Sequence, residues 1–143
     1  MKQRRPRLDI EIGNDFAELP RLHAAARDFL QAAQVDEMTR FAVLFALEEL
    51  VSNIIRYAYD DQFRHPIQVH FEQAAGSIEV EVVDDGRPFN PCPHPPPDTG
   101  LPPEKRPVGG LGIFLARELT QEMHYQRENN LNRVRLSFSG LAR

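Results

Sequence analysis

The pattern of apolar and polar positions divides the first half of the chain into a strand and two helices. Residues 8–12 alternate apolar and acidic side chains, which predicts an edge strand. Asn14 or Asp15 then offers a cap for a helix running to about Gln34, and Asp36 offers the cap of a second helix. This second helix is predicted from apolar residues at helical spacing: Phe41, Leu44, Leu47, Val51, Ile54, Ile55 and Ala58.

In the second half, alternation with period two returns on both sides of a proline-rich segment. Four stretches predict two hairpins: residues 67–73 with 77–85, and residues 124–128 with 132–138. Nine of the 12 prolines fall between residues 88 and 107, which predicts a long exposed loop, and residues 108–123 predict a helix. Runs of strands mixed with runs of helices favour an α+β sandwich, with helices on one face of a largely antiparallel sheet.

Composition narrows the class of protein. A chain of 143 residues is about one average domain, and its net charge of −4 offers no basic field for a phosphate backbone, so no nucleic-acid partner is expected. Phe41, Phe45 and Phe114 are predicted to lie in the core rather than to stack on bases. A single cysteine, Cys92, and the lack of a long apolar run favour a cytoplasmic protein without a membrane span.

Glu49 and Asn53 stand four positions apart in the second predicted helix, so their side chains share one face, while Glu48 points about 100° away. A carboxylate beside an amide oxygen suits a magnesium ion that carries nucleotide phosphates, and the carboxylate is alternatively a general base. On spacing alone the simpler interpretation is favoured, in which both residues cover the solvated side of the helix.

Asp84, Asp85 and Gly86 end the second strand of the first predicted hairpin. In a half-buried pocket Asp84 would accept a hydrogen bond from a purine amino group, and Gly86 would leave room for the ring. An ordinary Asp-Gly turn explains these residues equally well.

Gly109, Gly110 and Gly112 stand where the third helix is predicted to begin. Unpaired backbone N–H groups and the helix macrodipole favour an anion there, and a flexible hinge is the alternative. The standard phosphate motifs do not fit, because no G-x-x-x-x-G-K-[ST] is present and Leu115 occupies the third glycine position of G-x-G-x-x-G. A P-loop or Rossmann fold is therefore disfavoured.

The three motifs, in this order and with a long loop between the second and third, resemble the GHKL superfamily of gyrase, chaperone, histidine kinase and mismatch-repair ATPases. The resemblance is to its branch of anti-sigma-factor serine/threonine kinases of bacterial partner-switching systems. It covers nearly the whole chain: residues 48–53 resemble the N-box, residues 84–91 and 109–123 the two glycine boxes, and residues 130–138 the closing hairpin.

The resemblance implies a Bergerat ATP-binding fold, a two-layer sandwich with helices on one face of a mixed, mostly antiparallel sheet. It implies that Asn53 coordinates Mg²⁺ together with the ATP phosphates, that Glu49 is the general base, that Asp84 reads adenine, and that Gly86 shapes the adenine pocket. Residues 88–107 would then be a proline-rich ATP lid within a single domain spanning residues 1–143.

The phosphate contacts implied by the resemblance come from Gly109, Gly110 and Gly112, with Lys105 or, preferably, Arg106 reaching in from the lid. The chain departs from the family pattern at two positions. Tyr57 stands where related kinases often carry histidine, and Pro88 replaces the second glycine of D-x-G-x-G. The first departure bears on the kinase rate more than on nucleotide binding.

The leading interpretation is an ATP-dependent protein kinase that phosphorylates a small STAS-type antagonist on serine and also binds a sigma factor. The resemblance admits a homodimer. The alternative from a different class is a non-catalytic module that senses ATP or ADP and binds a regulatory partner, with Glu49 idle. The detached catalytic domain of a histidine kinase ranks third, because it would need a phosphoacceptor histidine on a separate helical bundle.

Overall fold

The computed structural model describes residues 5–92 and 110–139. The helices and strands follow one another in this order: β1 (Arg7–Gly13), the 3₁₀ helix η1 (Phe16–Glu18), α1 (Leu19–Ala32), α2 (Glu37–Tyr57), β2 (Pro66–Ala74), β3 (Ser77–Asp84), α3 (Gly110–Leu119), β4 (Glu122–Glu128) and β5 (Leu131–Ser139). No helix among the described residues is long and apolar enough to cross a membrane.

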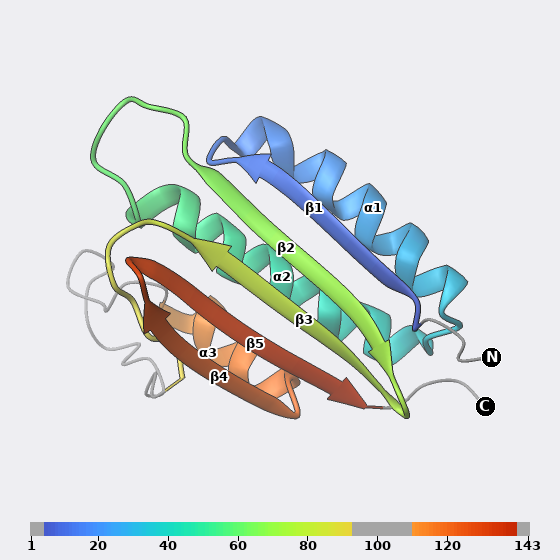
Figure 1. Cartoon of the computed structure of the whole chain (residues 1–143). Helices are drawn as coiled ribbons and strands as arrows, with labels where there is room; N and C mark the ends of the chain where they lie inside the picture. The colour runs from blue at the N-terminus through green and yellow to red at the C-terminus, as the bar shows by residue number, and fades with distance from the viewer. Residues whose placement is uncertain (1–4, 93–109, 140–143) are drawn as a thin grey trace.

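The strands form one five-stranded sheet in the order β1-β2-β3-β5-β4 (Figure 1). Each of its pairings is antiparallel. The helices α1, α2 and α3 all lie behind the sheet in Figure 1, so they cover one face of it. The predicted α+β sandwich is confirmed. Because β5 lies between β3 and β4, the register places Asn132 directly opposite Asp84.

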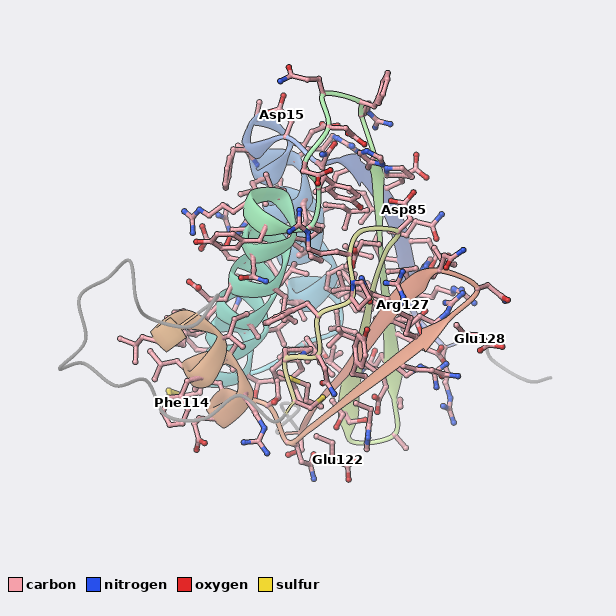
Figure 2. All side chains as sticks on the ribbon, turned by 90° about the vertical axis from the view of Figure 1, so that its left-hand side faces the viewer. Asp15, Asp85, Phe114, Glu122, Arg127 and Glu128 are labelled. Atoms are coloured by element: carbon pink, nitrogen blue, oxygen red, sulfur yellow. The ribbon has the colours of Figure 1, made fainter. Side chains whose placement is uncertain are left out.

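Alternation along the strands separates a buried face from a polar one. On β2, Ile67, Val69 and Phe71 are buried, while Gln68 between them is exposed. The buried side chains meet the apolar side of α2, where Leu47 and Val51 are fully buried in the same core cluster. Figure 2, which views the sheet on edge, shows the helices on one side of it only. The core therefore lies between the sheet and the helices.

The helix boundaries of the first half follow local capping signals. Asp36 caps α2 as predicted, with Oδ1 accepting a hydrogen bond from the backbone N–H of Thr39 at 2.8 Å. Asp15 is also a cap, but it caps η1, and α1 begins only at Leu19. Gln34, the predicted end of this helix, has a positive φ of 56°, so the α-helix ends before it.

The third helix is shorter than the predicted 108–123. It ends at Leu119, and Thr120 donates its hydroxyl hydrogen to the carbonyl of Arg117. Glu122 already belongs to β4, whose residue Met123 pairs with Leu136 of β5. This difference has a tertiary cause, because Glu122 and Met123 pair with β5 instead of extending the helix. The closing hairpin turns at Asn129 and Asn130, as predicted, and both have positive φ.

None of the three phenylalanines predicted to lie in the core is fully buried. Phe41 is 59% exposed, and Phe45 and Phe114 are half-buried. Phe41 and Phe45 pack against each other with ring centroids 6.0 Å apart. The apolar stripe of α2 is wider than the surface that the sheet covers, so the prediction for Phe41 is wrong. Figure 2 shows Phe114 on the helical side of the sandwich, away from the sheet.

Candidate functional site

A cavity of about 270 Å³ lies between the C-terminal half of α2 and the ends of β3 and β5. Its wall combines apolar side chains with a few polar ones from all three elements and from the segment after β3. The lining includes Asn53, Tyr57, Asp84, Phe89, Asn132 and Val134. A concave, mostly apolar site with a small number of convergent polar groups is the usual form of a small-molecule pocket. Two of the predicted site residues, Asn53 and Asp84, thus line the same cavity.

Asn53, which lines this cavity, has a buried side-chain oxygen atom without a hydrogen-bond partner among the described residues. The residue is only 6% exposed, and no described residue donates a hydrogen bond to its Oδ1. A buried carboxamide oxygen without a partner is costly, which makes it a candidate for a ligand that supplies one. A neutral oxygen donor of this kind fits Mg²⁺, which prefers hard oxygen ligands and keeps several waters.

Glu49 lies one helical turn before Asn53 and is half-buried, whereas Glu48 is exposed. Burial raises the pKa of the Glu49 carboxyl group, and the like charge of Glu48 raises it further, while Arg56 opposes both. A carboxylate whose pKa moves toward neutrality is better suited to accept a proton near pH 7. The predicted separation of the two glutamates is confirmed by their different exposure.

The carboxylate of Glu49 lies against the first turn of α3. A Cβ atom placed on Gly112 would collide with Oε2 of Glu49, so glycine at this position allows the close approach. Gly110 is the first residue of the same helix. The structure therefore brings Glu49 against Gly112, one of the three predicted phosphate-binding glycines, two residues after the start of α3 at Gly110. Gly109, Arg106 and Lys105 lie outside the described residues, as do residues 93–107 of the predicted lid.

Asp84 ends β3 with a side chain that is 4% exposed. Its Oδ2 accepts hydrogen bonds from the backbone N–H of Gly86 at 2.9 Å and from Nδ2 of Asn132 at 3.1 Å. Burial raises the pKa of Asp84, whereas these two hydrogen bonds lower it. Asp84 is therefore a buried acceptor at the cavity wall, and its hydrogen bond from the N–H of Gly86 is also that of an Asp-Gly turn, so both interpretations of this segment stay open.

Gly86 permits the turn after β3 to pack closely against the end of α2. A Cβ atom at this position would lie 2.5 Å from Cβ of Ala58 and 2.8 Å from its carbonyl oxygen. The backbone N–H of Arg87 donates to the same carbonyl at 3.0 Å. The glycine thus fixes the distance between the two elements that form one wall of the cavity.

Sequence reasoning missed two side-chain clusters around this turn. In the first, Asn132 contacts Asp84 and is itself held by Tyr125 and Arg127 of β4. These residues are far from Asp84 in sequence, and only the strand order, which no local motif predicts, brings them together. The register of β3 with β5 would have identified Asn132.

In the second cluster, Tyr59 and His65 stack with ring centroids 4.0 Å apart. Tyr59 donates its hydroxyl hydrogen to Asp85 at 2.9 Å, and His65 contacts Asp61 at 2.7 Å. The hydrogen bond to Asp61 raises the pKa of His65, and burial raises the pKa of Tyr59. This cluster ties the segment after α2 to the Asp84–Gly86 turn.

Comparison with known proteins agrees with this fold. A family model described as "Histidine kinase-like ATPase domain" matches residues 12–138. The serine/threonine-protein kinase BtrW of Bordetella bronchiseptica is 25% identical over 117 residues, which span 80% of this chain and 78% of BtrW.

A solved structure shows the same fold. It is the crystal structure of the RsbU and RsbW domains of Rv1364c from Mycobacterium tuberculosis, with a TM-score of 0.69 and 18% sequence identity. The match covers 94% of this chain but only 32% of that chain, so the chain spans about a third of the solved protein.

Proposed function

The chain belongs to the histidine kinase-like ATPase domain family, and from this premise we propose that it is an ATP-dependent serine/threonine kinase of a bacterial partner-switching system. Its protein substrate would be a small STAS-type antagonist, and its second binding partner would be a sigma factor. It would act in the cytoplasm as a single domain that is able to form a homodimer. The similarity to BtrW, a serine/threonine-protein kinase, supports the kinase activity.

The cavity between α2, β3 and β5 would take the adenine base. Asp84, a buried carboxylate at the cavity wall, would accept a hydrogen bond from the 6-amino group. Gly86 would shape the pocket by holding the turn against Ala58. Gly110 and Gly112 would offer backbone N–H groups to the phosphates, with Gly109 and Arg106 beside them.

Asn53 would hold Mg²⁺ through its unpaired Oδ1. When bound, the ion neutralises phosphate charge and orients the γ-phosphoryl group. Glu49, one turn away and next to the first turn of α3, would take the proton from the serine hydroxyl of the antagonist. Its raised pKa suits this role, because the carboxylate must hold the proton that it removes.

The proposal rests on two side chains that share one face of α2. Oδ1 of Asn53 is buried without a hydrogen-bond partner among the described residues, and the carboxylate of Glu49 is half-buried. Residues that merely covered a solvated helix face would be exposed and paired with water. The alternative function, an ATP- or ADP-sensing module without catalysis, is favoured by Tyr57, which lines the cavity at 45% exposure where related kinases often carry histidine.

The test uses radiolabelled Mg-ATP with a purified STAS-type antagonist. Glu49→Gln keeps the size of the side chain and removes the base, so phosphorylation should fall by a factor of roughly 10²–10⁴ while ATP affinity stays nearly native. Asn53→Ala should instead lose the Mg²⁺-dependent part of ATP affinity. Glu48→Gln, the same substitution at the exposed neighbour, is the matched control; it removes only the smaller of the two causes that raise the pKa of Glu49, so the rate should fall far less than in Glu49→Gln.

Each result decides between the hypotheses. If the wild-type protein binds ATP but transfers no radiolabelled phosphate to the antagonist, the result favours the non-catalytic nucleotide-sensing module over the kinase. A near-native rate for Glu49→Gln would place the base elsewhere, with Glu48 the first suspect. Loss of Mg-ATP binding in Glu49→Gln would assign Glu49 to the metal site.

A further inference from the structure

Asn132 is a buried polar residue to which the proposed function gives no role. It is 3% exposed, lies in β5 and pairs in register with Asp84 of β3. It also lines the cavity that would hold the adenine base. A buried amide has four hydrogen-bonding sites to satisfy, so its contacts define its orientation.

Two donors fix which way the Asn132 amide points. The hydroxyl of Tyr125 donates to Oδ1 at 2.6 Å, and Nη1 of Arg127 donates to the same oxygen at 3.0 Å. Because arginine cannot accept a hydrogen bond, the flipped amide would set Nδ2 against Nη1 with no acceptor. Nδ2 therefore faces Asp84 at 3.1 Å and the carbonyl of Arg87 at 3.0 Å.

In this orientation the two carboxylate oxygens of Asp84 accept different numbers of hydrogen bonds. Oδ2 accepts from both Asn132 and the N–H of Gly86, while Oδ1 accepts no hydrogen bond from any described residue. Oδ2 thus has two hydrogen bonds from the protein, whereas Oδ1 keeps its capacity to accept one, in a residue that lines the cavity. Arg127 also donates to the carbonyl of Gly86 at 2.9 Å, which ties the whole turn to β4.

The same contacts affect the charge state of Asp84. Burial raises the pKa of Asp84 and neighbouring Asp85 adds to it, whereas the hydrogen bond from Asn132 and the positive charge of Arg127 lower it. From the segment after α2, Tyr59 faces the same charges, and His65 contacts Asp85 at 3.6 Å. Without Asn132 and Arg127, burial would act on Asp84 with less opposition.

We propose that Asn132, locked by Tyr125 and Arg127, is a positioning residue that presents Asp84 as an ionised acceptor and so makes the pocket select purines with a 6-amino group. This inference rests on the proposed nucleotide site. An ionised Asp84 accepts from the amino group of ATP and repels the 6-carbonyl of inosine triphosphate, whereas a protonated Asp84 would donate to that carbonyl.

The experiment measures the ratio of Mg-ATP to Mg-inosine triphosphate affinity by calorimetry over a series of pH values from acid to neutral, because burial raises the pKa of Asp84. The ratio cancels phosphate ionisation, which is common to both nucleotides. The wild type should prefer ATP by roughly tenfold to a hundredfold at neutral pH and lose this preference as Asp84 protonates in acid.

Asn132→Asp keeps the shape of the side chain but sets a second carboxylate against Asp84. Two carboxylates this close share a proton, so the ATP preference should fall by about tenfold or more and return only at higher pH. Arg127→Met should change the ratio in the same direction and serves if Asn132→Asp does not fold. Arg135→Met, which removes an exposed arginine from the polar face of β5, is the matched control and should leave the ratio and its pH dependence native.

The possible results distinguish a failure of the proposed role of Asn132 from a failure of the proposed nucleotide-binding function. A wild type that binds neither nucleotide removes the proposed function and the inference together. A wild type that prefers ATP, with Asn132→Asp and Arg127→Met showing the native ratio and the native pH midpoint, overturns the inference alone. A merely structural role for Asn132 would lower stability and both affinities equally, without moving the ratio.

Discussion

Replacing Gly86 with alanine adds one methyl group where the structure has no room for it. The new Cβ would lie 2.5 Å from Cβ of Ala58, 2.8 Å from the carbonyl oxygen of Ala58 and 3.0 Å from Oδ2 of Asp84. Carbon atoms attract at about 3.5–4.0 Å, so the turn would have to move away from α2 by about 1 Å. One of the clashing atoms is backbone, which cannot rotate away.

The expected loss of stability follows from two effects. Overpacking of this kind typically costs about 1–3 kcal/mol. The movement would also stretch the 3.0 Å hydrogen bond from Arg87 to Ala58, whose loss adds about 1 kcal/mol. Because the 2.9 Å bond from the Gly86 N–H to Asp84 moves with the turn, we expect Gly86→Ala to weaken ATP binding by roughly tenfold or more.

Gly76 offers a control in which glycine is needed for a different reason. Its φ is +74°, and a Cβ atom there would meet nothing within 4 Å. Gly76→Ala should therefore lose about 1–2 kcal/mol through backbone conformation alone and keep native ATP affinity. Gly76→Asn should recover part of this loss, because asparagine tolerates the left-handed conformation.

Urea unfolding gives the stability of each variant, and calorimetry with Mg-ATP gives its affinity. The reasoning requires that the two alanine variants lose comparable stability while only Gly86→Ala loses nucleotide affinity. If Gly86→Ala binds Mg-ATP as tightly as the Gly76→Ala protein does, the close contact between the turn and α2 does not shape the pocket.

Two further variants test neighbouring parts of the site. In Gly112→Ala the atoms nearest to the new methyl group belong to the flexible side chain of Glu49, so this side chain can move away. Urea unfolding should therefore show native stability, or a gain of up to about 1 kcal/mol from helix propensity, while the phosphorylation rate falls because Glu49 is displaced. A native phosphorylation rate would mean that the position of Glu49 does not matter for the reaction. The hydrogen bond to Asp61 raises the pKa of His65, so His65 contributes stability that is complete below about pH 6.5 and is lost as the pH rises through the raised pKa. Thermal melts of His65→Gln at several pH values should lack this decline. If the melting temperatures of the wild type and of His65→Gln depend on pH in the same way, His65 makes no such contribution.

The features that the sequence predicted well are those encoded by neighbouring residues. Asp36 caps α2 through the N–H of Thr39, three residues on, and the turn at Asn129 and Asn130 needs only two residues that tolerate positive φ. The pairing of Glu49 with Asn53 on one face follows in the same way from helical geometry. The family assignment rested on such local motifs and is confirmed.

Features that depend on distant residues were missed or misplaced. The end of the third helix was predicted too late, because pairing of Met123 with Leu136 in the sheet overrides its helix-compatible pattern. Asn132 had no local signal, since its role depends on β5 lying beside β3. The exposure of Phe41 likewise depends on how much of α2 the other elements cover. The roles of Glu49, Asn53 and Asp84 in catalysis and binding stay predictions.

The strand order also sets when the cavity can form during synthesis. The hairpin of β2 and β3 and its pairing with β1 need only residues that leave the ribosome early (Figure 1). The hydrogen bond that closes the cavity wall joins residues 48 positions apart, from Asp84 to Asn132, and β5 enters the sheet between strands β3 and β4. Such non-local pairing forms late, because the intervening chain must first be ordered. A nascent chain that has released β3 but not β5 therefore lacks one wall of the cavity, so a nucleotide bound at the proposed site would stabilise only a chain whose sheet is complete.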